Sequence, residues 1–289
     1  MKKIMMLPIL LFTAAAFAQL KPVSYIEGSQ KLNGFAAVPD QPRMKKAGVL
    51  ILPAWMGIND HSKEVAQKLA KEGFYAFVAD IYGEGNYPKD TKEAGERAGY
   101  YKKNYKEYVK RISAALDQLI ASGADANNIV VIGYCFGGTG ALEAARAGLN
   151  VKGVVSFHGG LGKDASRPNG EIKTKVLVLH GADDPYVPAK DIEDFMKEMK
   201  EGKADWQMVY YSGAVHAFTE KEAGDDNSKG AAYNAKADKR SWNVFMDFLR
   251  EIVQEREKPG KLEPGSTGRK KAGTEKAAEK KKTKETEEN

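Results

Sequence analysis

The sequence has few of the residues that several classes of protein depend on. It holds one cysteine in 289 residues, which excludes an internal disulfide. Its four histidines are dispersed along the chain, and with that single cysteine they do not have metal-ligand spacing, so we expect no metal and no cofactor. A glycine cluster at 159–162 lacks the lysine of a phosphate-binding loop, and we interpret it as a turn.

Long apolar runs are also scarce. Residues 4–12 are apolar but too few to span a bilayer. Two lysines precede them and an Ala-x-Ala pattern follows at 16–18, which together are typical of a signal peptide over residues 1–18. No later stretch has the length and hydropathy of a transmembrane helix. We therefore expect an exported protein, periplasmic or secreted, whose mature chain begins at Gln19; the alternative is an uncleaved anchor.

The excess of positive charge is confined to the two ends of the chain. The formal net charge is +6, of which residues 258–289 supply +4 through nine lysines and one arginine against six glutamates. The lysines of the signal segment supply the other +2, so the body at 19–257 is neutral, which argues against nucleic-acid binding. Residues 258–289 have no aromatic and one large aliphatic residue, and we expect a disordered, solvated tail. Weak attachment to an anionic surface is the alternative.

Apolar runs and helical patterns alternate through the body. The run at 47–52 is continuous, as expected for a parallel strand covered on both faces, and further strands are expected at 129–133, 151–157 and 175–179. This alternation predicts an α/β protein with a mostly parallel, doubly wound sheet and helices on both faces. A body of about 240 residues suits one such domain.

Other segments give more specific expectations. Residues 23–26 and 34–38 resemble two short strands, joined by a turn at 31–34 where Asn-Gly favours positive φ. Residues 91–122 predict one long helix that carries four tyrosines. These either form aromatic walls of a substrate pocket or, as we favour, pack the amphipathic helix onto the body. A closing amphipathic helix is expected at 241–254.

The lone cysteine lies at the apex of a strand–turn–helix pattern. The apolar residues 129–132 precede the segment Gly-Tyr-Cys-Phe-Gly-Gly at 133–138, and helix-forming residues follow at 140–145. This is the G-x-S-x-G nucleophile elbow with sulfur in place of oxygen. The glycines avoid clashes beside a strained apex, and the following helix directs its N-terminal dipole at the sulfur. Both features favour a nucleophilic thiolate at Cys135.

Candidate partners for the cysteine follow in chain order. An acidic turn with Asp183 and Asp184 comes after the strand at 175–179, and His216 comes after the strand predicted at 206–211. Nucleophile, acid and histidine follow in this order in α/β-hydrolases, each after a strand. In that arrangement the acid orients the imidazole and the imidazole activates the nucleophile.

Taken together, these motifs resemble the dienelactone hydrolase family of α/β-hydrolases over residues 23–257. The resemblance is carried by G-x-C-x-G-G at 133–138, by H-G-x-x-D-x-x-V-P at 180–188, and by His216 with the phenylalanine two residues on. It implies an α/β-hydrolase fold without a cofactor. It also implies Asp184 as the acid, with Asp183 held in reserve.

The resemblance further implies an oxyanion hole formed by the backbone N–H groups of Phe136 and Trp55. Two departures accompany it. Founding members carry a glutamate where this chain has Ala54, and an arginine for the substrate carboxylate where this chain offers Glu220. We therefore expect a Cys–His–Asp hydrolase that cleaves a small ester or lactone through a thioester, but not dienelactone itself, because Glu220 would repel an anion.

Two other functions stay open at this point. A low-pKa thiol in an oxidising compartment is typical of a redox or peroxide-responsive protein, although no resolving cysteine is present. An inactive hydrolase fold that binds a ligand is the second, favoured by the missing glutamate at Ala54. The expected partner is a small-molecule ester or lactone and no nucleic acid is expected, while the sequence does not indicate an oligomeric state.

The remaining histidines receive structural interpretations. His180 precedes the acidic turn, and we expect it to form hydrogen bonds in the core. His61 is expected at a helix start without a catalytic role. His158 lies at a strand end, and bordering the pocket or lying away from it are equally compatible with its position.

Overall fold

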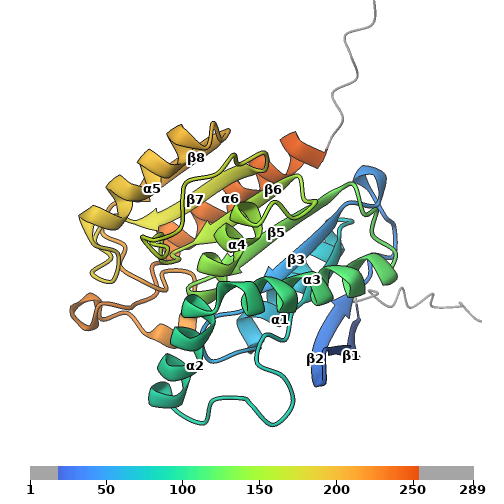
Figure 1. Cartoon of the computed structure of the whole chain (residues 1–289). Coiled ribbons are helices and arrows are strands. Elements are labelled where there is room, and N and C mark those ends of the chain that lie inside the picture. The colour runs from blue at the N-terminus through green and yellow to red at the C-terminus, as the bar shows by residue number, and fades with distance from the viewer. Residues whose placement is uncertain (1–18, 254–289) are drawn as a thin grey trace, which may run out of the picture. The chain divides into compact units, whose positions relative to one another are not determined.

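An eight-stranded sheet forms the centre of the computed structural model, which describes residues 19–253 (Figure 1). The predicted signal peptide at 1–18 and the tail at 258–289 lie outside the described residues. The strand order is β1-β2-β4-β3-β5-β6-β7-β8. The strands are β1 Leu20–Glu27, β2 Gln30–Ala37, β3 Gly48–Leu52, β4 Tyr75–Val78, β5 Ile129–Tyr134, β6 Gly153–Phe157, β7 Lys175–Gly181 and β8 Trp206–Tyr211.

Only one edge of the sheet is antiparallel. β1 pairs with β2, and β2 with β4, in antiparallel fashion, whereas every neighbouring pair from β4 through β8 is parallel. The predicted mostly parallel, doubly wound sheet is therefore confirmed. Since parallel strands all end at the same edge, the loops that follow β3, β5, β7 and β8 gather there.

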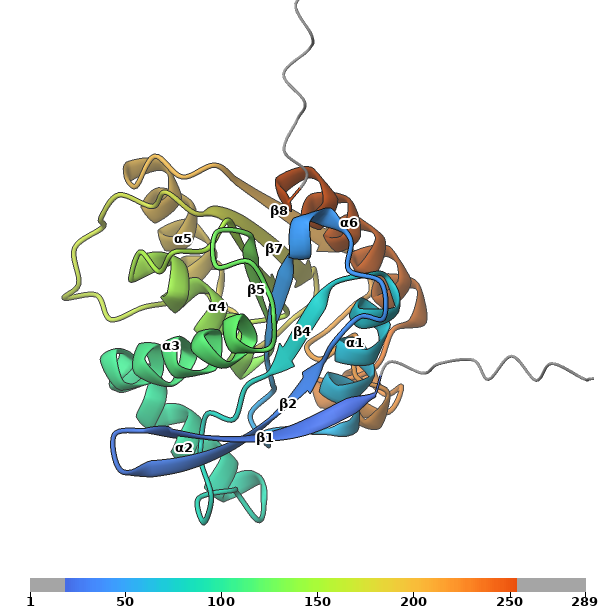
Figure 2. The same cartoon turned by 90° about the vertical axis from the view of Figure 1, so that its right-hand side faces the viewer.

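Helices cover both faces of this sheet, as the two views show (Figures 1 and 2). One apolar cluster joins the sheet to α3 (Tyr105–Ala121), α4 (Phe136–Arg146) and α5 (Ala189–Glu201), with α2 (Thr91–Lys103) beside them. A second cluster joins the opposite face to α1 (Asp60–Lys71) and α6 (Ala235–Val253). Three short 3-10 helices complete the described elements: η1 Met44–Lys46, η2 Lys221–Ala223 and η3 Asn227–Lys229.

The hairpin at the antiparallel edge turns earlier than predicted. Glu27 pairs with Gln30, so the turn occupies Gly28 and the residue after it, and Gly28 has a positive φ of 60°. The expected turn at 31–34 is therefore wrong. Gly34 lies inside β2. It has to be a glycine because a Cβ there would come within 2.6 Å of the Phe77 ring and of the Val78 carbonyl oxygen. Close packing, not turn geometry, explains this glycine.

Residues 91–122 form two helices instead of one. Asn104 has a non-helical backbone (φ −101°, ψ 54°) and separates α2 from α3. Tyr101 and Tyr108 are buried, and the Tyr108 ring stacks on Phe136 with 4.6 Å between centroids. These tyrosines therefore pack the helices onto the body. The closing helix α6 also begins six residues before the predicted start at 241.

A capping box starts α1 at Asn59. The Asn59 side chain accepts a hydrogen bond from the Ser62 backbone N–H, and Ser62 Oγ accepts one from the Asn59 N–H. Among the helices of residues 19–253, none combines the length and hydropathy needed to cross a membrane.

Candidate active site

Cys135 lies in a sharp turn between β5 and α4. Its backbone has φ 54° and ψ −114°, a conformation that costs a residue with a side chain about 1–3 kcal/mol. A Cβ on Gly133 would come within 1.9 Å of the Gly137 carbonyl oxygen, and one on Gly137 within 2.1 Å of the Leu52 carbonyl oxygen. Both glycines are therefore required by close backbone contacts, and these contacts hold the cysteine at the apex.

One hydrogen-bonded chain joins the sequence-predicted cysteine, histidine and aspartate. His216 Nε2 lies 3.0 Å from Cys135 Sγ, and His216 Nδ1 lies 2.9 Å from Asp184 Oδ2. The Asp184 side chain is fully buried. Asp183, the reserve candidate, instead accepts a hydrogen bond from the Gly213 backbone N–H at 3.0 Å. The loops after β5, β7 and β8 thus bring Cys135, Asp184 and His216 together.

The ionisation of His216 follows from its two partners. Burial lowers the pKa of His216, but the hydrogen bonds with Asp184 and Cys135 outweigh it and raise the pKa from 6.5 to about 10. The imidazole is consequently positive at neutral pH. This positive ring lies 3.0 Å from the Cys135 sulfur.

Phe136 and Trp55, whose backbone N–H groups are the expected oxyanion hole, line the same cavity as Cys135. Phe136 is the first residue of α4, where N–H groups have no acceptor within the helix. Trp55 follows β3 in a tight turn, closed by a 2.9 Å hydrogen bond from the Gly57 N–H to the Ala54 carbonyl. The Tyr82 hydroxyl donates to the Trp55 carbonyl at 2.6 Å and fixes this loop. The arrangement suits a two-donor oxyanion hole.

A cavity of about 960 Å³ opens at Cys135 and His216. This volume is typical of a small-molecule site. Large apolar side chains at its edge are partly exposed, with Tyr186 at 59% and Met56 at 40%. Its lining combines apolar and charged groups: Ala54, Trp55, Met56, Ile58, Phe136, Tyr186, Val187, Asp60, Lys63, Lys102, Glu220 and Glu222.

His158 lies beneath the elbow and not at the pocket border. It is fully buried, and its Nδ1 accepts a 3.2 Å hydrogen bond from the Cys135 backbone N–H, which also reaches the Phe157 carbonyl at 3.0 Å. His158 Nε2 lies 2.8 Å from Thr219 Oγ1 and donates to it, since Nδ1 is the acceptor. Burial, with the nearby His216 charge, lowers the pKa of His158 well below its ordinary value, so the ring is neutral.

The prediction that His180 forms hydrogen bonds in the core is wrong for its Nδ1 atom. His180 is buried, but its Nδ1 has no hydrogen-bond partner among the described residues. The ring instead packs edge-on against Tyr210, with centroids 5.5 Å apart. His180 therefore contributes packing and not a polar network.

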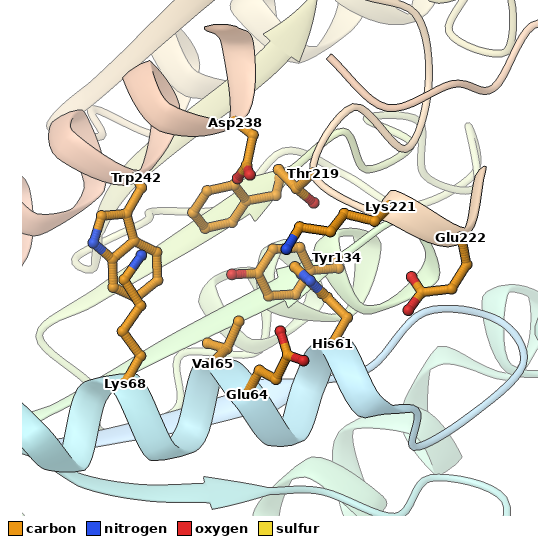
Figure 3. Close-up of a pocket in the computed structure, with 11 residues that line it drawn as sticks. His61, Glu64, Val65, Lys68, Tyr134, Thr219, Lys221, Glu222, Asp238 and Trp242 are labelled. Carbon is orange, nitrogen blue, oxygen red and sulfur yellow. The ribbon is translucent and has the colours of Figure 1, made fainter. Parts of the chain in front are cut away.

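A second pocket, of about 180 Å³, lies between α1 and α6 (Figure 3). Cys135 and His216 do not line it. His61 packs edge-on against Tyr134 there, and burial lowers the pKa of His61 to about 4, so this ring is neutral. Lys68 Nζ lies 3.5 Å from the centre of the Trp242 ring. The lining charges oppose one another, with two lysines against Glu64, Glu222 and Asp238, so the pocket does not favour ligands of one charge.

Both departures noted in the sequence fall in the main cavity. Ala54 is buried on its wall and brings no carboxylate to the cysteine. Glu220 lies on the wall near His216, where burial raises its pKa to about 7. The sequence position of Glu220 predicted that it lies near the substrate. It did not predict the raised pKa, which depends on burial in the folded protein.

The parallel sheet, with a nucleophile elbow after β5 and the aspartate and histidine after β7 and β8, defines an α/β-hydrolase. The chain belongs to the dienelactone hydrolase family, since the model of that family matches residues 32–253. The predicted family and the predicted enzyme class, an ester or lactone hydrolase, are confirmed.

Known proteins similar to this chain agree with that assignment. A Bradyrhizobium protein named a probable 2-oxo-3-(5-oxofuran-2-ylidene)propanoate lactonase is 29% identical, over 70% of this chain and 82% of its own. The crystal structure of a dienelactone hydrolase-like promiscuous phosphotriesterase, P91, from metagenomic libraries is 36% identical with a TM-score of 0.75, covering 81% of this chain and 98% of that one. An acylaminoacyl peptidase of Pyrococcus horikoshii, 13% identical with a TM-score of 0.64 over 83% of this chain and 42% of its own, shares the fold alone.

Proposed function

We propose that this protein hydrolyses small esters or lactones through a covalent thioester on Cys135, with His216 and Asp184 completing the catalytic triad. The observation that carries the proposal is the position of His216, 3.0 Å from the sulfur and 2.9 Å from the aspartate, at the floor of a 960 Å³ cavity. That geometry matches a nucleophile, its base and the group that orients the base.

In the first half-reaction, the Cys135 thiolate attacks the carbonyl carbon and a C–S bond forms. The displaced π electrons move onto the carbonyl oxygen, which accepts hydrogen bonds from the N–H groups of Phe136 and Trp55. The tetrahedral intermediate then expels the alkoxide, which takes a proton from the His216 imidazolium. The product is an alcohol and an acyl-thioester enzyme; in a lactone, the alcohol stays attached to the acyl group.

In the second half-reaction, neutral His216 removes a proton from water as that water attacks the thioester carbonyl. The same N–H groups hold the new oxyanion. The intermediate collapses and the C–S bond breaks. This regenerates the Cys135 thiolate and releases the carboxylic acid product. Asp184 holds the imidazole in the orientation that both proton transfers need.

Replacement of the nucleophile tests this proposal. Cys135→Ala is expected to lose roughly 1000-fold or more in kcat/KM for p-nitrophenyl acetate, because the covalent route is removed. Mass spectrometry of rapidly quenched wild-type enzyme should detect the acetyl group on Cys135. A folded Cys135→Ala protein with near wild-type turnover would overturn the mechanism.

Iodoacetamide separates the hydrolase from the two rival functions. In the proposed mechanism Cys135 is alkylated quickly at neutral pH, and His216→Gln slows alkylation because the neighbouring positive charge is lost. Rapid alkylation without ester turnover, together with reversible oxidation by peroxide, would favour a redox protein. Slow alkylation without turnover would favour a ligand-binding fold.

The names of the similar proteins suggest further substrate classes to test. One is called a lactonase and the other a promiscuous phosphotriesterase. We propose lactones as the first class to screen and phosphotriesters as the second, with carboxylic esters as the reference. Activity that depends on Cys135 in each class would show that one site serves them.

We also propose that the protein acts outside the cytoplasm. Residues 1–18 combine two lysines, a short apolar run and an Ala-x-Ala pattern, which supports export with cleavage before Gln19. Expression of the full chain in a Gram-negative host, followed by fractionation and N-terminal sequencing, tests this. An intact N-terminus on protein in the cytoplasm would contradict it.

A further inference from the structure

Glu220 stands out among the charged residues of the main cavity. It lines the cavity together with His216, which interacts with it electrostatically, and the structure gives it no ion pair with another described residue. Its Oε1 atom is buried and has no hydrogen-bond partner within the described part of the chain. The carboxylate of this cavity-lining residue therefore has an acceptor atom that no described group satisfies.

The other charges of the cavity differ in position or partner. Lys63 forms an ion pair with Asp60 at 3.4 Å and lies over the Phe35 ring. Lys102 of α2 differs in position, since its Nζ lies 4.0 Å from the place of a Cβ on Gly160. The charged groups that act most strongly on Glu220 are the His216 imidazolium, which favours its ionised form, and Glu222, which opposes it.

The floor of the cavity has little net charge in the proposed mechanism. The Cys135 thiolate and the His216 imidazolium compensate each other at 3.0 Å. Glu220 is therefore the charge beside the nucleophile that lacks a partner. A ligand could supply one with a positive group, and a negative group in the same place would be repelled.

We infer that Glu220 is a specificity-determining residue that selects esters bearing an ammonium or other cationic group. This inference rests on the proposed function, because it assigns a substrate class to the same site. The cationic group would lie beside Glu220, and the exposed aromatic ring of Tyr186, 5.4 Å from the His216 ring, also lines the cavity. Quaternary ammonium groups bind well at aromatic faces beside a carboxylate.

A matched pair of esters provides the test. Acetylcholine and 3,3-dimethylbutyl acetate have the same shape, but only the first is charged. Wild-type enzyme is expected to give a kcat/KM about tenfold higher for acetylcholine, as an ion pair of about 1.4 kcal/mol would produce. In Glu220→Gln this ratio should fall to about one, whereas the control Glu193→Gln, at an exposed position of α5 that does not line the cavity, should keep it.

The pH dependence of the ratio gives a second signature. Glu220 has a pKa of about 7, whereas His216 keeps its charge up to about pH 10. The wild-type preference for the charged ester should therefore rise through pH 7 and level off above it. In Glu220→Gln the ratio should not change with pH over this range.

Binding keeps the inference testable even without turnover. Choline and 3,3-dimethylbutanol can be compared by calorimetry on wild-type and Glu220→Gln proteins. Preferential choline binding that disappears in Glu220→Gln would support the inference even if neither ester is hydrolysed, a result that would overturn only the proposed function. Equal binding of both compounds to the wild-type protein, or equal loss of preference in Glu193→Gln, would overturn the inference.

Discussion

At the residue scale, two neighbouring imidazoles carry different charges because their partners differ. The rings of His158 and His216 lie edge-to-face with centroids 5.3 Å apart. His158 accepts from a backbone N–H and is fully buried, so it stays neutral. His216 lies between the Asp184 carboxylate and the Cys135 sulfur, so it holds a proton. Two like charges at this distance would destabilise each other, and the structure avoids that cost.

The raised pKa of His216 predicts a pH dependence of stability. Since the folded-state pKa is about 10 and the ordinary value is 6.5, the contribution to the free energy of unfolding is complete below pH 6.5. It is lost as pH rises toward 10. Urea denaturation at pH 6 and pH 10 should therefore show a larger loss for wild type than for His216→Gln, on the order of a few kcal/mol. Parallel pH profiles for the two proteins would contradict this assignment.

His158 is expected to be a positioning residue for the elbow. His158→Phe removes the acceptor for the Cys135 N–H and the donor to Thr219, so kcat should fall about 10–100-fold while KM changes little. His158→Asn retains a side-chain acceptor near Nδ1 and should recover part of kcat. Steady-state kinetics at several pH values would check both variants. If Asn were no better than Phe, the hydrogen bond to Cys135 would not be the reason for the loss.

At the element scale, the start of α4 is held against the end of β3 by a contact that only glycine permits. Gly137→Ala would place a methyl group within 2.1 Å of the Leu52 carbonyl oxygen, next to the loop that carries Trp55. We expect destabilisation of about 2 kcal/mol or more, with loss of activity, because the elbow and this loop must separate.

A matched control exists in α2. Gly99 is helical and has no atom within 4 Å of the Cβ position, so Gly99→Ala should stabilise the protein by about 0.5–1 kcal/mol. Thermal unfolding of both variants tests the steric argument. Similar unfolding midpoints for Gly137→Ala and the wild type would contradict it.

Segments in which several sequence signals agree could be predicted, whereas segments whose one signal fits two different structures could not. β8 was predicted with its observed bounds, and the elbow was placed because glycines, an apolar strand and a helix pattern coincide at Cys135. The Asn-Gly pair in β2 led to a wrong turn prediction. Gly34 is needed because a Cβ there would clash with the Phe77 ring, and the sequence alone does not distinguish such a glycine from one in a turn. The break at Asn104 was equally hidden, since helical residues flank it on both sides.

The same division holds for the site. The elbow pattern was sufficient to propose Cys135, chain order to propose His216, and the family motif to propose Asp184. The position of His158 beneath the elbow was not predictable, because β6 and β5 become neighbours only in the sheet. The signal in the sequence was only a histidine before glycines at a strand end. The shifted pKa of Glu220 likewise depends on burial among loops distant in sequence.

At the scale of the whole molecule, a buried ionic network connects α4 with the helix and the loop that lie beside it on the same face of the sheet. Arg146 of α4 forms two hydrogen bonds with Glu198 of α5, at 2.7 and 3.0 Å, and one with Glu143 at 2.9 Å. It also donates to the Leu161 carbonyl at 2.8 Å. Arg167 completes the network through the other oxygen of Glu143. Two helices and the loop after β6 are therefore linked through one guanidinium.

Loss of this guanidinium is expected to destabilise the fold strongly. The side chains of Arg146, Glu143 and Glu198 are each 4–5% exposed, so Arg146→Met would leave the Glu198 carboxylate buried without a cation. Breaking one partner of a buried ion pair typically costs about 3–5 kcal/mol, whereas replacing both partners by apolar groups can be close to neutral. The double variant Arg146→Met/Glu198→Met should therefore recover much of the stability that Arg146→Met loses. Urea denaturation of the single and double variants measures this coupling; if the double variant were less stable than Arg146→Met, the penalty would come from lost packing and not from an unpaired charge.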